Sequence, residues 1–260
     1  MLNVNKAELL ELLYNMTKMM SPARLRHDNV TVSRLLQRPG EFVVTFPKAY
    51  HGGFSYGFNC GEAVNFAVPE WISYSRESSE VYRKAQRSAA VSHDKMVTTL
   101  TLNLPDHDFF GGRLVLDELT KIKEEEMSRR MRLIKMGARI PTAPLPKFKL
   151  GVIEEESEDY DERRVCKTCK HTLFMSAVAC GCDQLAVSCL RCATEHCDCP
   201  MASRFIMCWF KERDLEHMVE TAQNYVTHLS LGLVSMDSIR RYRRDINPFE
   251  QTWPEDEEAE

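Results

Sequence analysis

Large apolar side chains recur at every second position along residues 42–46, which is the pattern of a half-buried β-strand. Pro47 follows directly and interrupts strand pairing. A glycine-rich bend then leads into a second extended segment at residues 63–67. The pattern therefore predicts two strands joined by a bend, and it places His51 at the end of the first strand.

Helices are predicted on both sides of this segment by apolar spacing, by helix-forming composition and by capping residues. A later helix, in the cysteine-rich half of the chain, is expected to start at Asp214. Before that half, the predicted helices cover residues 6–20, 71–87, 92–104 and 114–136.

The last of these four helices carries two Glu–Arg pairs four residues apart, Glu125/Arg129 and Glu126/Arg130, and it ends before Gly137. Such pairs support a helix, and glycine is common just past a helix C-terminus. The charge density predicts an exposed helix between domains.

Prolines and an acidic run follow this helix and predict a linker, so a domain boundary is expected near residues 150–160. The parts predicted in chain order are a β-structure with its preceding helix, a helical region with the linker, a cysteine-rich module with a C-terminal helix, and a mobile tail. Their ranges are 1–75, 76–160, 161–226 and 227–260.

The chain has 260 residues, 43% of them hydrophobic, which is enough for two modest domains. A formal net charge of −4 argues against a general nucleic-acid binder, although charge is uneven. Charge runs are usually solvated; the alternative for the basic run is a contact with DNA or a histone. That run contains Arg240, Arg241, Arg243 and Arg244.

No apolar run approaches the roughly 18 residues of a membrane span, and the first residues lack the apolar core of a signal peptide. A soluble, intracellular protein without membrane association is therefore expected. In that reducing setting, clustered cysteines indicate metal binding more than disulfides.

Eight of the ten cysteines fall within 34 residues as four closely spaced pairs. Four pairs of thiolates supply two tetrahedral sites of the kind that structural zinc requires, and a redox relay or scattered thiols are the less favoured alternatives. Spacing leaves the pairing open, and a cross-brace of alternate pairs is favoured. One ion would take Cys166, Cys169, Cys189 and Cys192, and the other Cys180, Cys182, Cys197 and Cys199. The remaining cysteines, Cys60 and Cys208, are interpreted as small buried hydrophobes.

The string from Gly40 to Ala67, together with Met20-Ser21-Pro22, resembles the C-terminal half of the JmjC domain of Fe(II)- and 2-oxoglutarate-dependent histone lysine demethylases. The resemblance implies an α+β fold, in which the C-terminal half of a double-stranded β-helix (JmjC or cupin-like) is followed by helices and a small two-zinc module. It also implies a nuclear protein that acts on histone tails in chromatin.

In that family the residue equivalent to His51 is the last ligand of a 2-His-1-carboxylate iron site. The positions of Ala63 and Asn65 line the methyl-lysine pocket. The cysteine module resembles the zinc finger with five Cys, one His and two Cys that follows the JmjC domain in some members. The chain departs from it, because Cys192 stands where the family usually has the His. His196 is the alternative ligand, and Cys192 is favoured because it keeps the two-residue gap.

An iron site of this kind needs a second His and a carboxylate, and 2-oxoglutarate needs a basic residue. In the family these lie upstream of the matched segment. Within the chain, the candidate pairs are adjacent residues whose side chains would diverge, or they fall inside the cysteine cluster. They are His27-Asp28, His93-Asp94, His107-Asp108 and His196-Cys-Asp198.

Two structural zinc ions are therefore expected in this chain, with Fe(II) and 2-oxoglutarate only in a full-length parent protein. The favoured function is the C-terminal part of an Fe(II)/2-oxoglutarate-dependent histone lysine demethylase acting on chromatin, incomplete as a catalyst by itself. The alternative is a non-catalytic zinc-binding chromatin interaction module. A zinc-stabilised interaction protein of another kind would explain the cysteines but not the string around His51.

Overall fold

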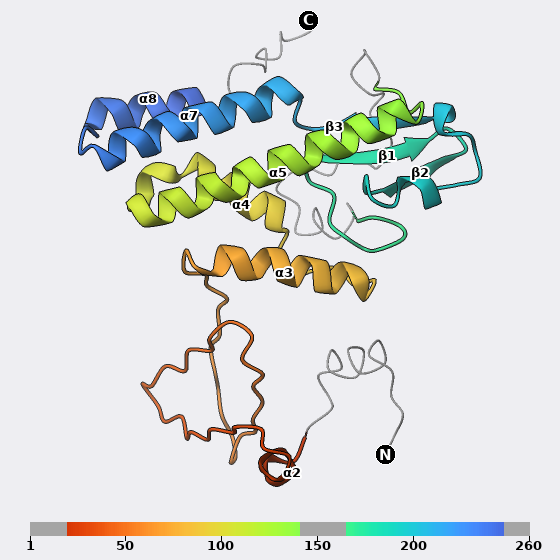
Figure 1. Cartoon of the computed structure of the whole chain (residues 1–260). Helices are drawn as coiled ribbons and strands as arrows, with labels where there is room; N and C mark the ends of the chain where they lie inside the picture. Colours follow the sequence, from red (N-terminus) through yellow and green to blue (C-terminus); the bar gives the residue numbers. More distant parts are fainter. Residues whose placement is uncertain (1–19, 141–164, 247–260) are drawn as a thin grey trace, which may run out of the picture. The chain divides into compact units, whose positions relative to one another are not determined.

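The computed structural model describes residues 20–140 and 165–246 (Figure 1). The chain forms two compact units, Met1–Phe66 and Ala67–Glu260. The helix predicted at residues 6–19 and the linker predicted after residue 140 lie outside the described residues.

In the first unit the described residues form one short helix, α2 (Pro22–His27), with Pro22 at its first turn. Residues 28–66 contain no strand, so the strands predicted at 42–46 and 63–67 are not observed there. Phe42 is 95% exposed and Phe46 is 76% exposed. An isolated strand pair is marginally stable without further strands and a covering layer, and the described part of this unit supplies neither. The double-stranded β-helix is therefore not confirmed.

The second unit begins with three helices close to the predicted positions: α3 (Trp71–Lys84), α4 (His93–Leu102) and α5 (Phe109–Lys135), with the 3-10 turn η1 (Leu104–Asp106) after α4. Ser92 caps α4 as predicted, because its side chain accepts a hydrogen bond from the Lys95 backbone N–H. The Asp108 side chain caps α5 by accepting from the Gly111 N–H at 2.7 Å, which explains why this helix begins before the predicted Leu114. Gly137 has φ +103°, the left-handed conformation that ends a helix.

Helix α5 is central to the second unit, so the prediction of an exposed helix between domains was wrong. Apolar residues on one face, including Leu116, Leu119 and Ile122, are buried in a core shared with α4 and α7. Many of the charges that suggested exposure are paired, as in the buried Glu126–Arg130 bridge at 2.8 Å. Pairing allows charged residues to be buried beside an apolar face.

The cysteine-rich region forms an antiparallel sheet with strand order β2-β1-β3. The strands are β1 (Ser176–Cys180), β2 (Asp183–Ser188) and β3 (Arg204–Cys208), and the 3-10 turns η2 (Ala193–Glu195) and η3 (Met201–Ser203) lie between β2 and β3. Beyond β3, Arg139 continues the pairing: its N–H donates to the Arg204 carbonyl at 3.1 Å, and its carbonyl accepts from Ile206 at 2.8 Å. The residues just after α5 therefore cover the outer edge of β3.

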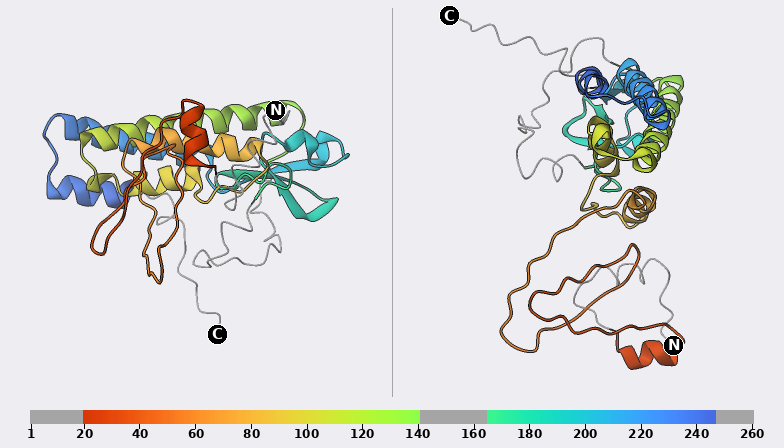
Figure 2. Two further views of the ribbon diagram at one scale, coloured as in Figure 1. Left: turned by 90° about the horizontal axis from the view of Figure 1, so that it is seen from below. Right: turned by 90° about the vertical axis from the view of Figure 1, so that its left-hand side faces the viewer.

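Helix α7 (Glu212–Ser230) comes after the sheet in the chain. Helix α8 (Met236–Ile246) then folds back and lies along α7 (Figures 1 and 2). The Tyr242 hydroxyl donates to the Thr101 carbonyl at 2.6 Å, and both Tyr242 and Ile246 are buried. The prediction of a mobile tail over residues 227–260 was therefore wrong for residues 227–246. These residues form the end of α7 and helix α8, and the buried face of α8 packs onto the helical core. The helices and the cysteine-rich region lie in the same compact unit.

No helix in the described parts of the chain is both long and apolar enough to cross a membrane.

Glu118 joins α3 and α4 to α5. Its carboxylate accepts from His93 Nε2 at 2.9 Å and from Arg76, while its side chain is only 4% exposed. Burial opposes ionisation of this carboxyl, but the hydrogen bonds from His93 and Arg76 and the positive charge of Arg76 outweigh burial and lower its pKa to about 2. The ionised carboxylate is thus part of the packing between these helices.

Replacing Glu118 with Ala is expected to lower the free energy of unfolding of the second unit by about 2–4 kcal/mol, because it leaves the buried His93 and the partly buried Arg76 without this acceptor. The matched control is Asp117→Ala on the same helix, which breaks the exposed Arg113–Asp117 pair and should cost no more than about 0.5 kcal/mol. Urea unfolding at pH 7 compares them. Equal losses in the two variants would contradict the assigned role of Glu118.

The lowered pKa of Glu118 also predicts a pH dependence. Its contribution to stability is complete above its ordinary pKa of 4.5 and is lost as pH falls toward about 2. The difference in unfolding free energy between the wild type and Glu118→Gln should be constant from pH 7 to pH 5 and shrink below pH 4.5. A difference that stays constant down to pH 3 would rule out this linkage.

Candidate metal centre

Four cysteines from two tight turns form the first group, here called cluster A: Cys166, Cys169, Cys189 and Cys192. Their sulfur atoms lie within 4.8 Å of one another, and all four residues are buried. The first turn is closed by the Lys170 N–H, which donates to the Cys166 carbonyl at 2.9 Å, and the second by the Cys192 N–H, which donates to the Cys189 carbonyl at 3.0 Å. The two-residue gaps in the sequence therefore fold as turns that direct paired thiols to one point.

The second group, cluster B, contains Cys180, Cys182, Cys197 and Cys199, again with sulfurs within 4.8 Å of one another. Cys180 ends β1, and Cys182 follows it in the β1–β2 turn. Cys197 and Cys199 come from the loop between η2 and η3. Cluster B is less buried than cluster A, since Cys182 is exposed.

Both clusters fit zinc. Each offers four soft sulfur ligands to one ion and leaves no position for water, which is the arrangement of a structural site and not of a catalytic one. In the described residues, these two are the groups of three or more His, Cys, Asp or Glu side chains close enough to share a metal. The geometric grouping is the cross-brace that the sequence favoured.

The thiols of cluster A also influence one another's ionisation. Hydrogen bonds from Cys169 and Cys189 lower the pKa of Cys166, whereas hydrogen bonds with Cys166 and Cys169 raise the pKa of Cys189. Four neighbouring thiols therefore do not all ionise readily by themselves. A divalent cation removes this restriction, because metal binding to thiols displaces their protons.

His196 lies outside both clusters. It is 1% exposed, and its Nδ1 shares a hydrogen bond of 2.9 Å with the Ser188 hydroxyl. Burial and the charges of Lys167 and Arg204 lower its pKa, which favours the neutral imidazole. Of the two alternative ligands, the structure thus brings Cys192 to the other thiols and not His196.

The other two cysteines differ from each other. Cys60 is exposed, so its interpretation as a buried hydrophobe was wrong, whereas Cys208 is partly buried beside Val178 and Ile206. The extended segment predicted just after Cys60, at residues 63–67, is not observed as a strand in the described structure.

His51 is exposed, and its Nδ1 faces the Ala49 carbonyl at 3.3 Å. Ala63 and Asn65 are also exposed. In the residues that the structure describes, no second His or carboxylate joins His51 in a group that could hold a metal. The described residues therefore do not fit an Fe(II) and 2-oxoglutarate site by themselves.

The basic run lies on α8, and its four arginines are exposed. Arg243 contacts Asp106 at 2.9 Å, Arg244 contacts Asp245 at 2.9 Å, and Arg240 lies 3.7 Å from Asp237. These carboxylates reduce the positive charge available to a polyanion. The arrangement does not show a DNA contact.

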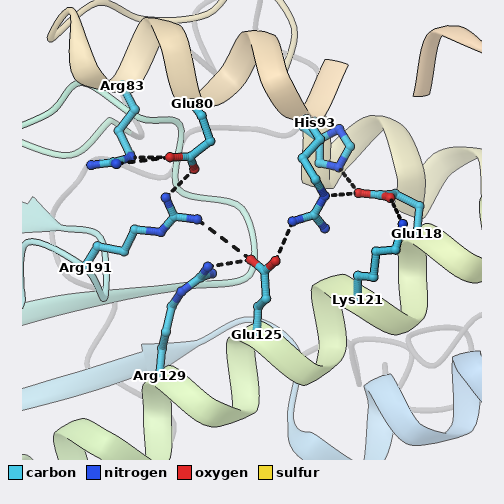
Figure 3. Close-up of polar contacts among 9 residues, drawn as sticks. Glu80, Arg83, His93, Glu118, Lys121, Glu125, Arg129 and Arg191 are labelled. Carbon is cyan, nitrogen blue, oxygen red and sulfur yellow. Dashed lines mark hydrogen bonds and ion pairs between the residues drawn. The ribbon is translucent and has the colours of Figure 1, made fainter. Parts of the chain in front are cut away.

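Arg191, between two ligands of cluster A, connects the finger to the helices (Figure 3). It donates to Glu80 of α3 and lies 3.8 Å from a carboxylate oxygen of Glu125 on α5. Glu80 also accepts from Arg83 at 3.0 Å, and Glu125 accepts from Arg76 at 2.6 Å. Sequence reasoning missed this network, because its members come from three elements far apart in the chain.

Purified protein is expected to hold about two zinc ions per chain. Cys192→Ser should retain about one after dialysis against a chelator, because cluster A loses one of its four ligands. His196→Asn and the control Cys208→Ser, a cysteine outside both clusters, should each retain two. Metal analysis by mass spectrometry gives the numbers. Loss of one zinc from His196→Asn with full retention in Cys192→Ser would reverse the ligand assignment.

Comparison with known families gives two matches, of which the second agrees with this geometry. The model described as "JmjC domain, hydroxylase" matches residues 2–66, and the model described as "C5HC2 zinc finger" matches residues 166–218. The second match includes all eight cysteines of clusters A and B.

Three curated relatives illustrate the wider similarity. Lysine-specific demethylase JMJ17 of Arabidopsis thaliana is 30% identical over 216 residues, which are 83% of this chain and 17% of the relative. Lysine-specific demethylase 5B of Gallus gallus is 34% identical over 194 residues, 73% of this chain and 12% of the relative. Lysine-specific demethylase JMJ703 of Oryza sativa subsp. japonica is 31% identical over 225 residues, which are 81% of this chain and 17% of the relative. The chain spans less than a fifth of the length of these relatives. It is similar to these lysine-specific demethylases, and within it a JmjC match is followed by a C5HC2 zinc-finger match.

Proposed function

We propose that this chain is the C-terminal part of an Fe(II)- and 2-oxoglutarate-dependent histone lysine demethylase that acts on chromatin. The observation that carries the proposal is the order of the two family matches, a JmjC segment followed by a C5HC2 finger, within a stretch shared with lysine-specific demethylases. Two closed four-cysteine clusters within the second match support it.

Different roles are proposed for the residues of the two units. His51 is proposed as one iron ligand, and Ala63 and Asn65 as part of the pocket for the methylated lysine. Among the described residues, His51 belongs to no group of three or more potential metal ligands, so these 260 residues alone are expected to be incomplete as a catalyst. Bound Fe(II) and 2-oxoglutarate would supply the oxidative chemistry in a longer parent protein.

The finger is proposed as a structural element with two zinc ions. Its sheet packs onto α5 through buried hydrogen bonds, among them those from Arg130 to the Phe210 carbonyl at 2.8 Å and from Ser176 to Glu126. Zinc-bound cluster B at the Cys180 end of β1 and the helix contact at its Ser176 end would then stabilise each other, since metal binding adds to folding free energy. A nuclear location, binding to histone tails and a contact of the α8 arginines with DNA belong to the same proposal.

The role of His51 is tested in a chimera in which this chain replaces its matched segment in lysine-specific demethylase 5B of Gallus gallus. The chimera should release formaldehyde from a methyl-lysine histone peptide, and His51→Ala should reduce release to background, because the iron site loses a ligand. His27→Ala is the matched control, an exposed histidine of the same unit that pairs with Asp28, and it should leave the rate unchanged.

Two results would contradict the proposal. An active chimera that is unaffected by His51→Ala would exclude His51 as a ligand. Formaldehyde release by the isolated 260-residue chain, with stoichiometric iron, would show a substitute ligand set and disprove incompleteness.

The second candidate function is a non-catalytic zinc-binding module that interacts with chromatin. It is favoured by the exposure of His51, which lies outside the groups of three or more potential metal ligands found in the described residues. It would be supported by an inactive chimera together with zinc-dependent binding of the isolated chain to mononucleosomes.

A further inference from the structure

We infer that Arg204, the first residue of β3, is the positioning residue of cluster B. It holds the loop that carries Cys197 and Cys199 in the conformation that brings their thiols to Cys180 and Cys182. The inference deepens the proposed function and rests on the zinc-binding role proposed for cluster B.

The contacts of the guanidinium carry the inference. Nη1 donates to the carbonyl of Ala193, and Nη2 donates to the carbonyls of Cys197 and Cys199, the latter at 2.9 Å. These three carbonyls span the loop from η2 to the second ligand. The residue is 4% exposed, and its Nε has no partner among the described residues. The loop carbonyls therefore account for the placement of this buried charge.

The backbone of Arg204 is fixed independently of its side chain. In the β1–β3 ladder it lies opposite Cys180, another ligand of cluster B. Its carbonyl accepts from Arg139, and the preceding carbonyl, of Ser203, lies 3.5 Å from the Cys180 sulfur. One residue thus connects the strand that carries one ligand with the loop that carries two others.

Arginine suits this position for two physical reasons. Its planar group has five N–H donors, so it can bind several carbonyls at once, whereas a lysine ammonium is a single point charge. A buried cation is costly unless it is compensated, and four thiolates around one divalent zinc leave a net negative charge beside it. The loop of cluster A is held differently, because Arg191 turns to Glu80 and Glu125.

Residues that hydrogen-bond around metal ligands typically change metal affinity by about 10- to 100-fold when they are replaced. Arg204→Met is therefore expected to weaken zinc binding at cluster B by about 10- to 100-fold and to leave cluster A unchanged. Arg204→Lys, which keeps a buried charge but loses the fork of donors, should show a smaller loss at the same cluster.

The matched control is Arg130→Met. Arg130 is also a buried arginine that donates to backbone carbonyls, at Phe210 and Met175, and neither of these acceptors belongs to the loop from Ala193 to Cys199. It should lower the melting temperature without weakening one zinc site selectively. A merely structural Arg204 would behave in the same way.

Zinc transfer to a chromophoric chelator measures the two affinities, and cadmium-113 NMR of the cadmium-substituted protein identifies the site. Two resonances are expected. The one that changes in Cys182→Ser belongs to cluster B, and both Arg204 variants should change that resonance alone. Equal weakening of both sites, or no weakening, in the two Arg204 variants would overturn the inference. A wild-type protein without zinc would overturn the zinc assignment itself, which keeps the two failures distinct.

Discussion

The buried pair of Glu126 and Arg130 is the contact on which the packing of the Ala67–Glu260 unit depends. Both residues are on α5, yet their remaining hydrogen-bonding groups are satisfied by the finger: Arg130 donates to the Phe210 carbonyl, and Glu126 accepts from the Ser176 hydroxyl. A buried ion pair is stable only when such additional bonds are present, because desolvation of two charges is expensive. The pair therefore requires the sheet to be in place, and the sheet in turn is held against the helix.

The same short strands connect this contact to the metal sites. Strand β1 begins at Ser176, which donates to Glu126, and ends at Cys180 of cluster B. Strand β3 runs antiparallel from Arg204 to Cys208, with Cys208 opposite Ser176. A zinc ion that orders one end of these strands consequently favours the ordered helical packing at the other end, since a ligand that binds only the folded state adds its binding free energy to stability.

Local signals made the finger and most helices of this unit predictable. Cys-x2-Cys spacing determines a turn within a few residues, and capping by Ser92 or termination at Gly137 involves neighbours in sequence. The burial of α5 could not be predicted in this way, because its Glu and Arg residues read as a solvated surface until their partners on other elements are known. Arg191 and Arg204 were missed for the same reason: their acceptors are defined by tertiary structure and not by spacing.

The first unit shows the opposite failure, in which a strong local pattern did not produce the predicted structure. Alternation along residues 42–46 determines which side chains would face a core. The backbone hydrogen bonds of a strand, however, are made with neighbouring strands. No described residue pairs with this segment, and Phe42 and Phe46 remain exposed. An arrangement that adds both pairing strands and a layer packed on this face would bury these rings and convert an unfavourable exposed face into a stabilising one. The JmjC match and the lack of strands in residues 28–66 are therefore compatible, and the position of His51 depends on strand partners more than on its own segment.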